Sequence, residues 1–189
     1  MGQIYLYYGT GGGKTSNALG LALRSVGHHQ RVVIVQFMKW RTDTGEYMVK
    51  EMLRPYYEIY QFGRPGWMRA GSSDEGDKEI RLGEVRLQLR GVETLDRELA
   101  QKGLEFAKKT MLETRPSLLV LDEICLAVHL GLLTIGEVLD TLKQIPEETD
   151  IVMTGRFASK EFVDRADFVN EIVDMKSPQE FVLKKGIQY

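Results

Sequence analysis

The chain has 189 residues, of which 43% are hydrophobic and 28% are charged, and its formal net charge is −2. This length fits one domain with a core of its own, and the slight acidic excess does not fit a protein that binds nucleic acid, which usually carries excess Lys and Arg. A single cysteine, Cys125, excludes an internal disulfide. With no apolar run long enough to span a membrane and no signal-peptide pattern, we expect a cytoplasmic protein with no nucleic-acid or membrane partner.

The first forty residues follow a strand–loop–helix–strand pattern. Residues 3–8 are aromatic and β-branched, which is typical of a short strand. Residues 15–27 carry apolar side chains at spacings of three and four, which predicts a helix that ends at Gly27. Residues 31–37 form a continuous apolar run, as expected for a strand that is buried on both faces of a parallel sheet.

The rest of the chain continues this alternation. Residues 63–76 are rich in Gly, Ser and Pro and predict a loop, and residues 77–113 are charged and helix-favouring, with breaks near Gly91 and Gly103. We expect further strands at 56–61, 117–121, 150–153 and 168–174, and helices at 44–53, 135–143 and 160–165. The alternation predicts a three-layer α/β domain with a mainly parallel sheet, whose ligands bind at the carboxyl ends of the strands.

A glycine-rich loop connects the first predicted strand to the first predicted helix. Four glycines in five positions let backbone N–H groups approach one oxyanion, and the helix adds its positive N-terminal end. Lys14 offers a mobile charge to phosphate oxygens, and Thr15 offers a hydroxyl to Mg²⁺. The pattern predicts a P-loop NTPase (RecA-like) fold, although the loop is one residue shorter than usual. The residues expected to bind ATP are Gly9, Thr10, Gly11, Gly12, Gly13, Lys14, Thr15 and Ser16.

Acidic and basic residues follow two later strands. Asp122 and Glu123 follow an apolar run, so we expect them to hold Mg²⁺ with Thr15, directly or through water, whereas an exposed strand cap is the alternative. Arg156 after the next strand, and Arg24 on the first helix, are candidates for phosphate contacts, although a surface salt bridge is the more common role of such a residue. Lys14, Thr15 and Glu123 are the candidate catalytic residues.

In combination these segments resemble the P-loop type of ATP:corrinoid adenosyltransferase. The resemblance covers almost the whole chain and includes the shortened loop. Its blocks, in order, are GTGGGKTSNALGLALRSVGH (9–28), VIVQFMK (33–39), LLVLDEI (118–124), TGR (154–156), ADFVNEI (166–172) and GIQY (186–189).

The resemblance implies a reaction in which cob(I)alamin attacks the 5′ carbon of ATP and triphosphate leaves. Cobalt(I) is a strong nucleophile, so the protein needs no base and instead holds the leaving group and aligns the reactants. The family further implies Mg²⁺, a homodimer, an electron-donating flavoprotein reductase, and ATP bound in the reverse sense along the loop. Trp67 aligns with an aromatic residue that contacts the lower face of the corrin ring, although Pro65 stands where the family has phenylalanine.

Two other departures from the family pattern concern length and the terminal motif. The single domain, residues 1–189, carries an insertion around residues 70–92, and Gln188 stands where the family usually has an acidic residue. Two other functions share the same loop. One is a P-loop ATPase or kinase that cleaves a phosphoanhydride bond, and the other is a non-enzymatic, ATP-dependent binding module.

Overall fold

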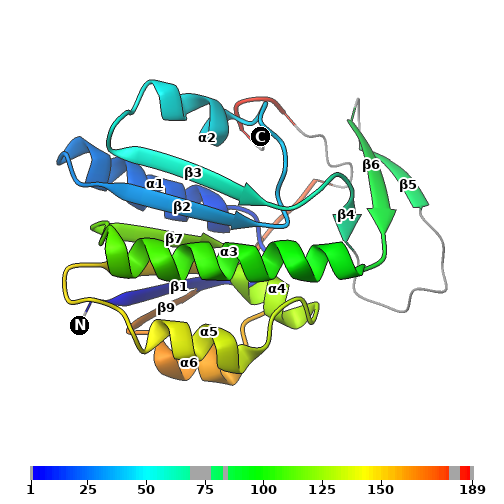
Figure 1. The fold of residues 1–189 in the computed structure, drawn as a ribbon. Helices are drawn as coiled ribbons and strands as arrows, with labels where there is room; N and C mark the ends of the chain where they lie inside the picture. The colour runs from blue at the N-terminus through cyan, green and yellow to red at the C-terminus, as the bar shows by residue number, and fades with distance from the viewer. Residues whose placement is uncertain (1, 69–77, 83–84, 179–183, 188–189) are drawn as a thin grey trace.

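The protein is described by a computed structural model that covers residues 2–68, 78–82, 85–178 and 184–187 (Figure 1). The side chains of residues 67, 78–82 and 85–89 lie outside this description. Two sheets are present, and the larger one carries the candidate site.

Six parallel strands form the larger sheet, in the order β3-β2-β7-β8-β1-β9. All six residues of β2 are buried, as its continuous apolar run predicts. The strand predictions are confirmed, except that the last strand ends at Glu171 instead of residue 174. The strands are β1 (Ile4–Tyr8), β2 (Val32–Phe37), β3 (Tyr57–Phe62), β7 (Leu118–Asp122), β8 (Asp150–Gly155) and β9 (Phe168–Glu171).

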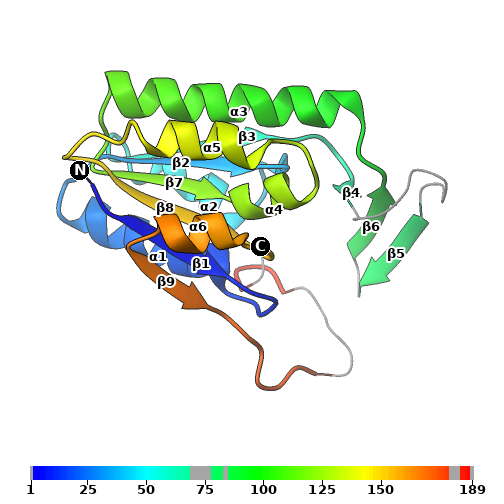
Figure 2. The same cartoon turned by 90° about the horizontal axis from the view of Figure 1, so that it is seen from below.

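Helices cover both faces of this sheet, which confirms the predicted three-layer α/β fold. In Figure 2, α1 lies on one side of the sheet, and α3, α4 and α5 lie on the other. The residues of β2 divide accordingly, with Val32 and Ile34 packed in the α1 layer and Val33, Val35 and Phe37 packed in the α3 layer. The helices are α1 (Lys14–Gly27), α2 (Gly45–Met48), the 3-10 helix η1 (Val49–Glu51), α3 (Thr94–Glu113), α4 (Ile124–His129), α5 (Ile135–Leu142) and α6 (Lys160–Arg165).

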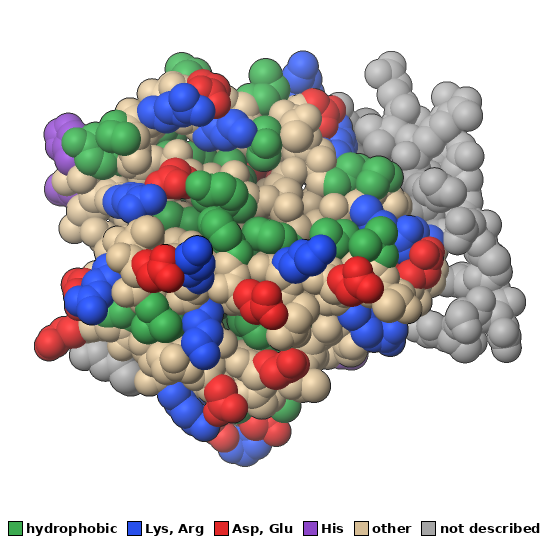
Figure 3. Space-filling view, viewed as in Figure 1, with side chains coloured by type: hydrophobic (Ala, Val, Ile, Leu, Met, Phe, Trp, Pro, Cys, Tyr) green, Lys and Arg blue, Asp and Glu red, His purple; other side chains and the backbone are tan. Residues whose placement is uncertain are grey.

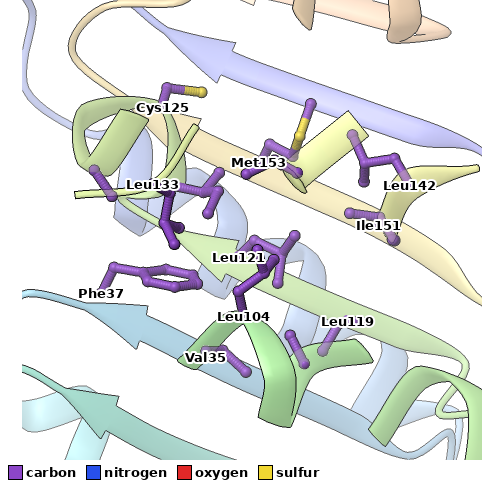
Figure 4. Packing of buried hydrophobic residues seen from close by; sticks show 14 of the residues in the cluster. Val35, Phe37, Leu104, Leu119, Leu121, Cys125, Leu133, Leu142, Ile151 and Met153 are labelled. Carbon is purple, nitrogen blue, oxygen red and sulfur yellow. The ribbon is translucent and has the colours of Figure 1, made fainter. Parts of the chain in front are cut away.

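The core on the α3 side is continuous from α3 across the sheet to α5. Figure 4 shows Val35 and Phe37 of β2 beside Leu104 of α3 and Leu121 of β7. Each of these four side chains is at most 4% exposed. This packing fixes the carboxyl ends of β2 and β7, where two of the predicted site residues lie.

The prediction of helix through residues 77–113 is wrong for its first part. Residues 78–82 and 85–90 form an antiparallel pair, β5 (Lys78–Leu82) and β6 (Val85–Arg90), and β4 (Trp67–Met68) joins it in parallel. In the sequence, Ile80, Leu82, Val85, Leu87 and Leu89 form a strand-like alternation within the two strands. The helix-favouring charged residues between them concealed this pattern. The small sheet lies beside the start of α3 (Figure 1).

A helix break at Gly103 was also expected, and α3 instead runs through it without interruption. A Cβ atom at this position would lie 2.9 Å from the Phe37 ring and 3.1 Å from Phe62. Gly103 therefore allows α3 to approach the sheet closely. The break near Gly91 is confirmed, because α3 begins after it, at Thr94.

Candidate functional site

The glycine-rich loop connects β1 to α1 at the carboxyl edge of the sheet. Gly9 and Gly13 have left-handed backbones, with φ of +115° and +100°. Gly13 is the N-cap of α1, and no side chain caps the helix, so the N–H groups of its first turn are oriented toward an incoming anion. Lys14 folds back over the loop, and its Nζ donates a hydrogen bond to the Gly11 carbonyl oxygen at 2.6 Å.

A cavity of about 790 Å³ opens beside this loop. The loop and the first turns of α1 form one wall, and the segment around α2 and η1 forms another. Gly186 and Ile187, from the terminal GIQY block, also line the cavity. Of the predicted site residues, the cavity brings together Gly12, Gly13, Lys14, Thr15, Ser16 and Glu123.

The segment after β9, residues 172–174, passes directly over the loop, and we call it the C-terminal strap. The Gly11 N–H donates to the Ile172 carbonyl oxygen at 2.9 Å. A Cβ atom at Gly9 would lie 2.3 Å from that same oxygen, and one at Gly11 would lie 2.7 Å from the backbone of Val173. Glycine is therefore required at positions 9 and 11 by the strap, whereas the prediction assigned both residues to phosphate binding alone.

Asp122 is fully buried and accepts hydrogen bonds from four side chains. Thr15 Oγ1 and Thr154 Oγ1 donate to Oδ1 at 2.8 and 2.7 Å. Gln36 Nε2 donates to Oδ2 at 3.0 Å, and Lys39 Nζ pairs with Oδ2 at 2.7 Å. Burial alone would raise the pKa of Asp122, but Lys39 and the hydroxyl donors outweigh it and hold the pKa below its usual range. Asp122 is therefore a charged hub that ties β7 to α1, β2 and β8.

The pKa of Glu123 is shifted in the opposite direction from that of Asp122. Its backbone is left-handed, with φ of +66°, so the chain turns sharply from β7 into α4. Burial and the neighbouring charge of Asp122 both raise the pKa of Glu123. Among the described residues, no hydrogen-bond partner reaches its buried Oε2 atom.

Lys14 and Arg156 supply positive charge at the same edge, whereas Arg24 does not. Burial lowers the pKa of Lys14, and the carboxylate of Glu123 opposes that shift. Arg156 is exposed directly after β8, and its charge lowers the pKa of both Lys14 and Glu123. Arg24 lies in the last turn of α1, about 15 Å along the helix from Lys14, and does not line the cavity.

A second cavity of about 180 Å³ adjoins the first and is mainly apolar. Lys39, Glu46 and Glu123 line both cavities, so the two share a wall. Met38, Trp40, Leu126 and Leu130 supply apolar surface, and Gly66 and Met68 lie on either side of Trp67 in the chain. The backbone of Trp67 lies in β4, and its side chain is outside the described part of the structure.

Gln36, Lys39 and Thr154 were missed as site residues. Gln36 and Thr154 lie near the carboxyl ends of β2 and β8, and Lys39 follows β2 by two residues. The rule that ligands bind at the carboxyl edge of a parallel sheet points to these positions. Their partner could not be known from the sequence, because nothing in the apolar runs shows that β2 and β8 both flank β7.

None of the three histidines lines either cavity, and neither does Cys125. His28 and His29 are exposed after α1, and His129 packs against the Phe157 ring with centroids 4.2 Å apart. Cys125 is buried, and burial raises its pKa to about 12. The described residues include no cluster of three or more His, Cys, Asp and Glu side chains suited to a metal, and no helix long and apolar enough to cross a membrane.

Known proteins are similar to this chain over most or all of its length. An uncharacterized protein of Nostoc sp. (strain PCC 7120) is 33% identical over 188 residues, which cover 94% of this chain and 45% of that protein. This chain therefore spans less than half of that relative. A corrinoid adenosyltransferase of Sinorhizobium sp. is 29% identical over 192 residues, covering all of this chain and 80% of the relative. The corrinoid adenosyltransferase of Escherichia coli (strain K12) is 28% identical over 190 residues, covering all of this chain and 86% of the relative.

A family model supports the same assignment. The model described as ATP:corrinoid adenosyltransferase BtuR/CobO/CobP matches residues 1–189. The match runs from the glycine-rich loop, through the Asp122 hub, to the terminal block at the cavity, as the sequence resemblance predicted. The chain belongs to the ATP:corrinoid adenosyltransferase family.

Proposed function

We propose that this protein transfers the 5′-deoxyadenosyl group of ATP to the cobalt of a reduced corrinoid, cob(I)alamin, and releases triphosphate. The observation that carries the proposal is the shared wall of Lys39, Glu46 and Glu123 between the phosphate-loop cavity and the apolar cavity. One cavity suits a polyanion, and the other suits an apolar surface. A reaction between the two ligands would take place where the cavities meet.

The loop side supplies charge stabilisation for a leaving group. The first-turn amides of α1, Lys14 and Arg156 would stabilise negative charge as it builds on the triphosphate. Cobalt(I) supplies the electron pair, the Co–C bond forms, and the bond between C5′ and its phosphate oxygen breaks. No proton moves in this step, so Glu123 need not act as a base.

The residues around Thr15 fit Mg²⁺. The Thr15 hydroxyl and the Glu123 carboxylate are hard oxygen donors, and Glu123 Oε2 has no partner among the described residues. Asp122 already accepts four hydrogen bonds and fits the role of orienting Thr15 instead. Mg²⁺ often uses few protein carboxylates together with phosphate oxygens, and when bound it would neutralise part of the triphosphate charge.

The resemblance extends the proposal to the corrinoid side. Gly66 and Met68 line the apolar cavity, which supports a contact between the segment around Trp67 and a flat ring bound there. The family resemblance also supports a homodimer that receives reduced corrinoid from a flavoprotein reductase.

The products of the reaction test the proposal. The protein is incubated in the dark with Mg-ATP and chemically reduced cob(I)alamin, and the products are separated by chromatography. We expect a light-sensitive adenosylcobalamin and triphosphate in equal amounts. The Lys14→Ala variant should form both products at least about a hundredfold more slowly, because the leaving group loses its mobile counter-charge.

Other products would identify the alternative functions. ADP or inorganic phosphate without alkylcobalamin would mean that the protein is a phosphoanhydride-cleaving ATPase or kinase. ATP binding with no turnover, combined with salt-dependent DNA affinity, would mean that it is a binding module.

A further inference from the structure

Among the described residues, Asp122 accepts a hydrogen bond from Thr15, and a second carboxylate, that of Asp174, also contacts the phosphate loop. The Gly12 N–H donates to Asp174 Oδ1 at 3.0 Å. Asp174 is exposed and lies 162 residues further along the chain. This contact therefore does not follow from the loop sequence and depends on how the two segments meet in the fold.

The sheet brings Asp174 to the loop. β9 runs parallel to β1, with Glu171 opposite Tyr8, so both strands end at the same edge (Figure 2). The Ile172 N–H then donates to the Tyr8 carbonyl oxygen at 2.7 Å, and the Gly11 N–H donates to the Ile172 carbonyl oxygen at 2.9 Å. These backbone bonds fix the C-terminal strap, and Asp174 follows two residues after Ile172.

Asp174 also attracts the lysine expected to hold phosphate. The carboxylates of Glu123 and Asp174 both exert an electrostatic attraction on the Lys14 ammonium group. A phosphate bound to the loop would attract Lys14 in the same way. In this structure the Asp174 carboxylate therefore accepts a loop N–H that a phosphate could use, and it lies close enough to Lys14 to attract it.

We propose that Asp174 is a resident anion of the phosphate loop, and that a phosphate of ATP must displace it from the Gly12 amide. Asp174 would thereby set the affinity of the loop for triphosphate. Two anions on neighbouring donors repel each other, and one N–H makes one good hydrogen bond. The return of Asp174 to Gly12 would favour release of the triphosphate product. This inference rests on the proposed function, because it assumes that the loop binds triphosphate.

Calorimetric titration with ATP, inorganic triphosphate and adenosine tests the inference, with Mg²⁺ present throughout. Asp174→Asn keeps an oxygen acceptor but removes the charge, and Asp174→Ala removes both. Glu171→Gln is the matched control, because it removes one negative charge from an exposed position on β9 just before the strap. It leaves the Gly12 hydrogen bond in place.

We expect both Asp174 variants to bind triphosphate and ATP about three- to tenfold more tightly than the wild type, with alanine at least equal to asparagine. Adenosine affinity should not change, and Glu171→Gln should have less than about a twofold effect. Unchanged or weaker triphosphate binding in both Asp174 variants would overturn the inference while leaving the proposed function intact. A wild-type protein that binds neither ATP nor triphosphate would overturn the proposed function itself.

Discussion

At the scale of single residues, the charge of Asp122 depends most on Lys39. The Asp122 side chain is 1% exposed, and the Lys39 side chain is 29% exposed. The two hydroxyls and the Gln36 amide stabilise the carboxylate by hydrogen bonding, but only Lys39 among its four donors carries a full positive charge. Removing that charge would leave an uncompensated carboxylate in the interior, which is strongly unfavourable.

Lys39→Met should therefore destabilise the fold by about 2–3 kcal/mol, somewhat less than the roughly 3–5 kcal/mol typical of broken buried pairs, because Lys39 is partly exposed. The free energy of unfolding is measured by urea titration at neutral pH. Lys109→Met is the control, because it breaks an ion pair between exposed side chains, with 3.9 Å between Lys109 Nζ and Glu113 Oε2. It should change stability by less than about 0.5 kcal/mol. Equal effects from the two variants would mean that Lys39 does not sustain the Asp122 charge.

The neighbouring carboxylates of Asp122 and Glu123 show what the sequence could and could not predict. It placed Asp122 and Glu123 at a strand end beside the phosphate loop, and both lie there. It could not separate their roles, because adjacent carboxylates at a strand end look alike in a sequence. The difference arises from β2 and β8, which surround Asp122 with donors, while the left-handed turn at Glu123 leaves one of its oxygens without a partner.

At the scale of elements, a buried ion cluster joins the start of α3 to the wall of the apolar cavity. Asp96 lies in the first turn of α3 and completes its capping box with Glu93. Arg90 donates to both oxygens of Asp96, and Arg64 does the same. Arg90 also donates to the Pro65 carbonyl oxygen at 3.1 Å, next to Gly66 of the cavity wall.

Asp96→Asn should destabilise the fold by about 2–4 kcal/mol at neutral pH, because it removes the charge of the carboxylate that pairs with the buried Arg90. Burial would raise the pKa of Asp96, but the hydrogen bonds from Arg90 and Arg64 outweigh it and hold the pKa well below its usual range. The folded-state pKa is thus lower than that of the unfolded chain. The stabilisation should be complete above about pH 5 and should decline as the pH falls below about 3.9.

This dependence is measured by urea titration of the wild type and Asp96→Asn between about pH 3.5 and about pH 7. The range begins just below the unfolded-state pKa of Asp, which is about 3.9. The difference between the two proteins should be constant from pH 5 to pH 7 and should shrink below that interval. A difference that grows on acidification would show that Asp96 does not carry its charge in the folded protein.

The packing of α3 gives a second prediction at this scale. Gly103→Ala gains helix propensity of about 1 kcal/mol, but its methyl group would meet Phe37 and Phe62, and Phe37 is fully buried. The steric overlap should outweigh the gain in helix propensity and lower the free energy of unfolding by about 1–2 kcal/mol. Gly20→Ala on α1 is the matched control, since no atom outside its chain neighbours and its own helix backbone lies within 4 Å of the Cβ position, and it should be neutral or stabilising. Thermal unfolding of the two variants compares them, and a gain for Gly103→Ala would mean that α3 can move away from the sheet.

Elements were predicted best where one physical signal was dominant. The buried strands β2 and β7 are apolar except for Gln36 and the terminal Asp122, and both were predicted nearly to their bounds. The β5 and β6 pair was missed because its alternation competes with charged, helix-favouring residues. α4 was not predicted at all, because its start depends on the left-handed backbone of Glu123, which is an unusual conformation for a residue other than glycine.

At the scale of the whole molecule, the strand order explains why distant segments form one site. β1, β7 and β8 are neighbours in the sheet, so the glycine loop, the Asp122 hub and Arg156 meet at one edge. The sequence predicted the fold class and this edge, but not the order β3-β2-β7-β8-β1-β9, which requires long-range pairing. On the face shown in Figure 3, basic and acidic side chains are interspersed.

Because the site joins the phosphate loop to Gly186 and Ile187 near the end of the chain, ligand binding should stabilise the whole domain. A ligand that binds only the folded state at a hundred times its Kd adds about 2.7 kcal/mol. For a chain of this length, that corresponds to a rise in Tm of roughly 5–10 °C. We expect such a rise with Mg-ATP and with triphosphate, and a much smaller one with adenosine, when Tm is followed by circular dichroism. Lys14→Ala should retain its own fold, since Asp122 keeps all four partners, yet lose most of the shift. A full shift in that variant would mean that the triphosphate binds elsewhere than on the glycine loop.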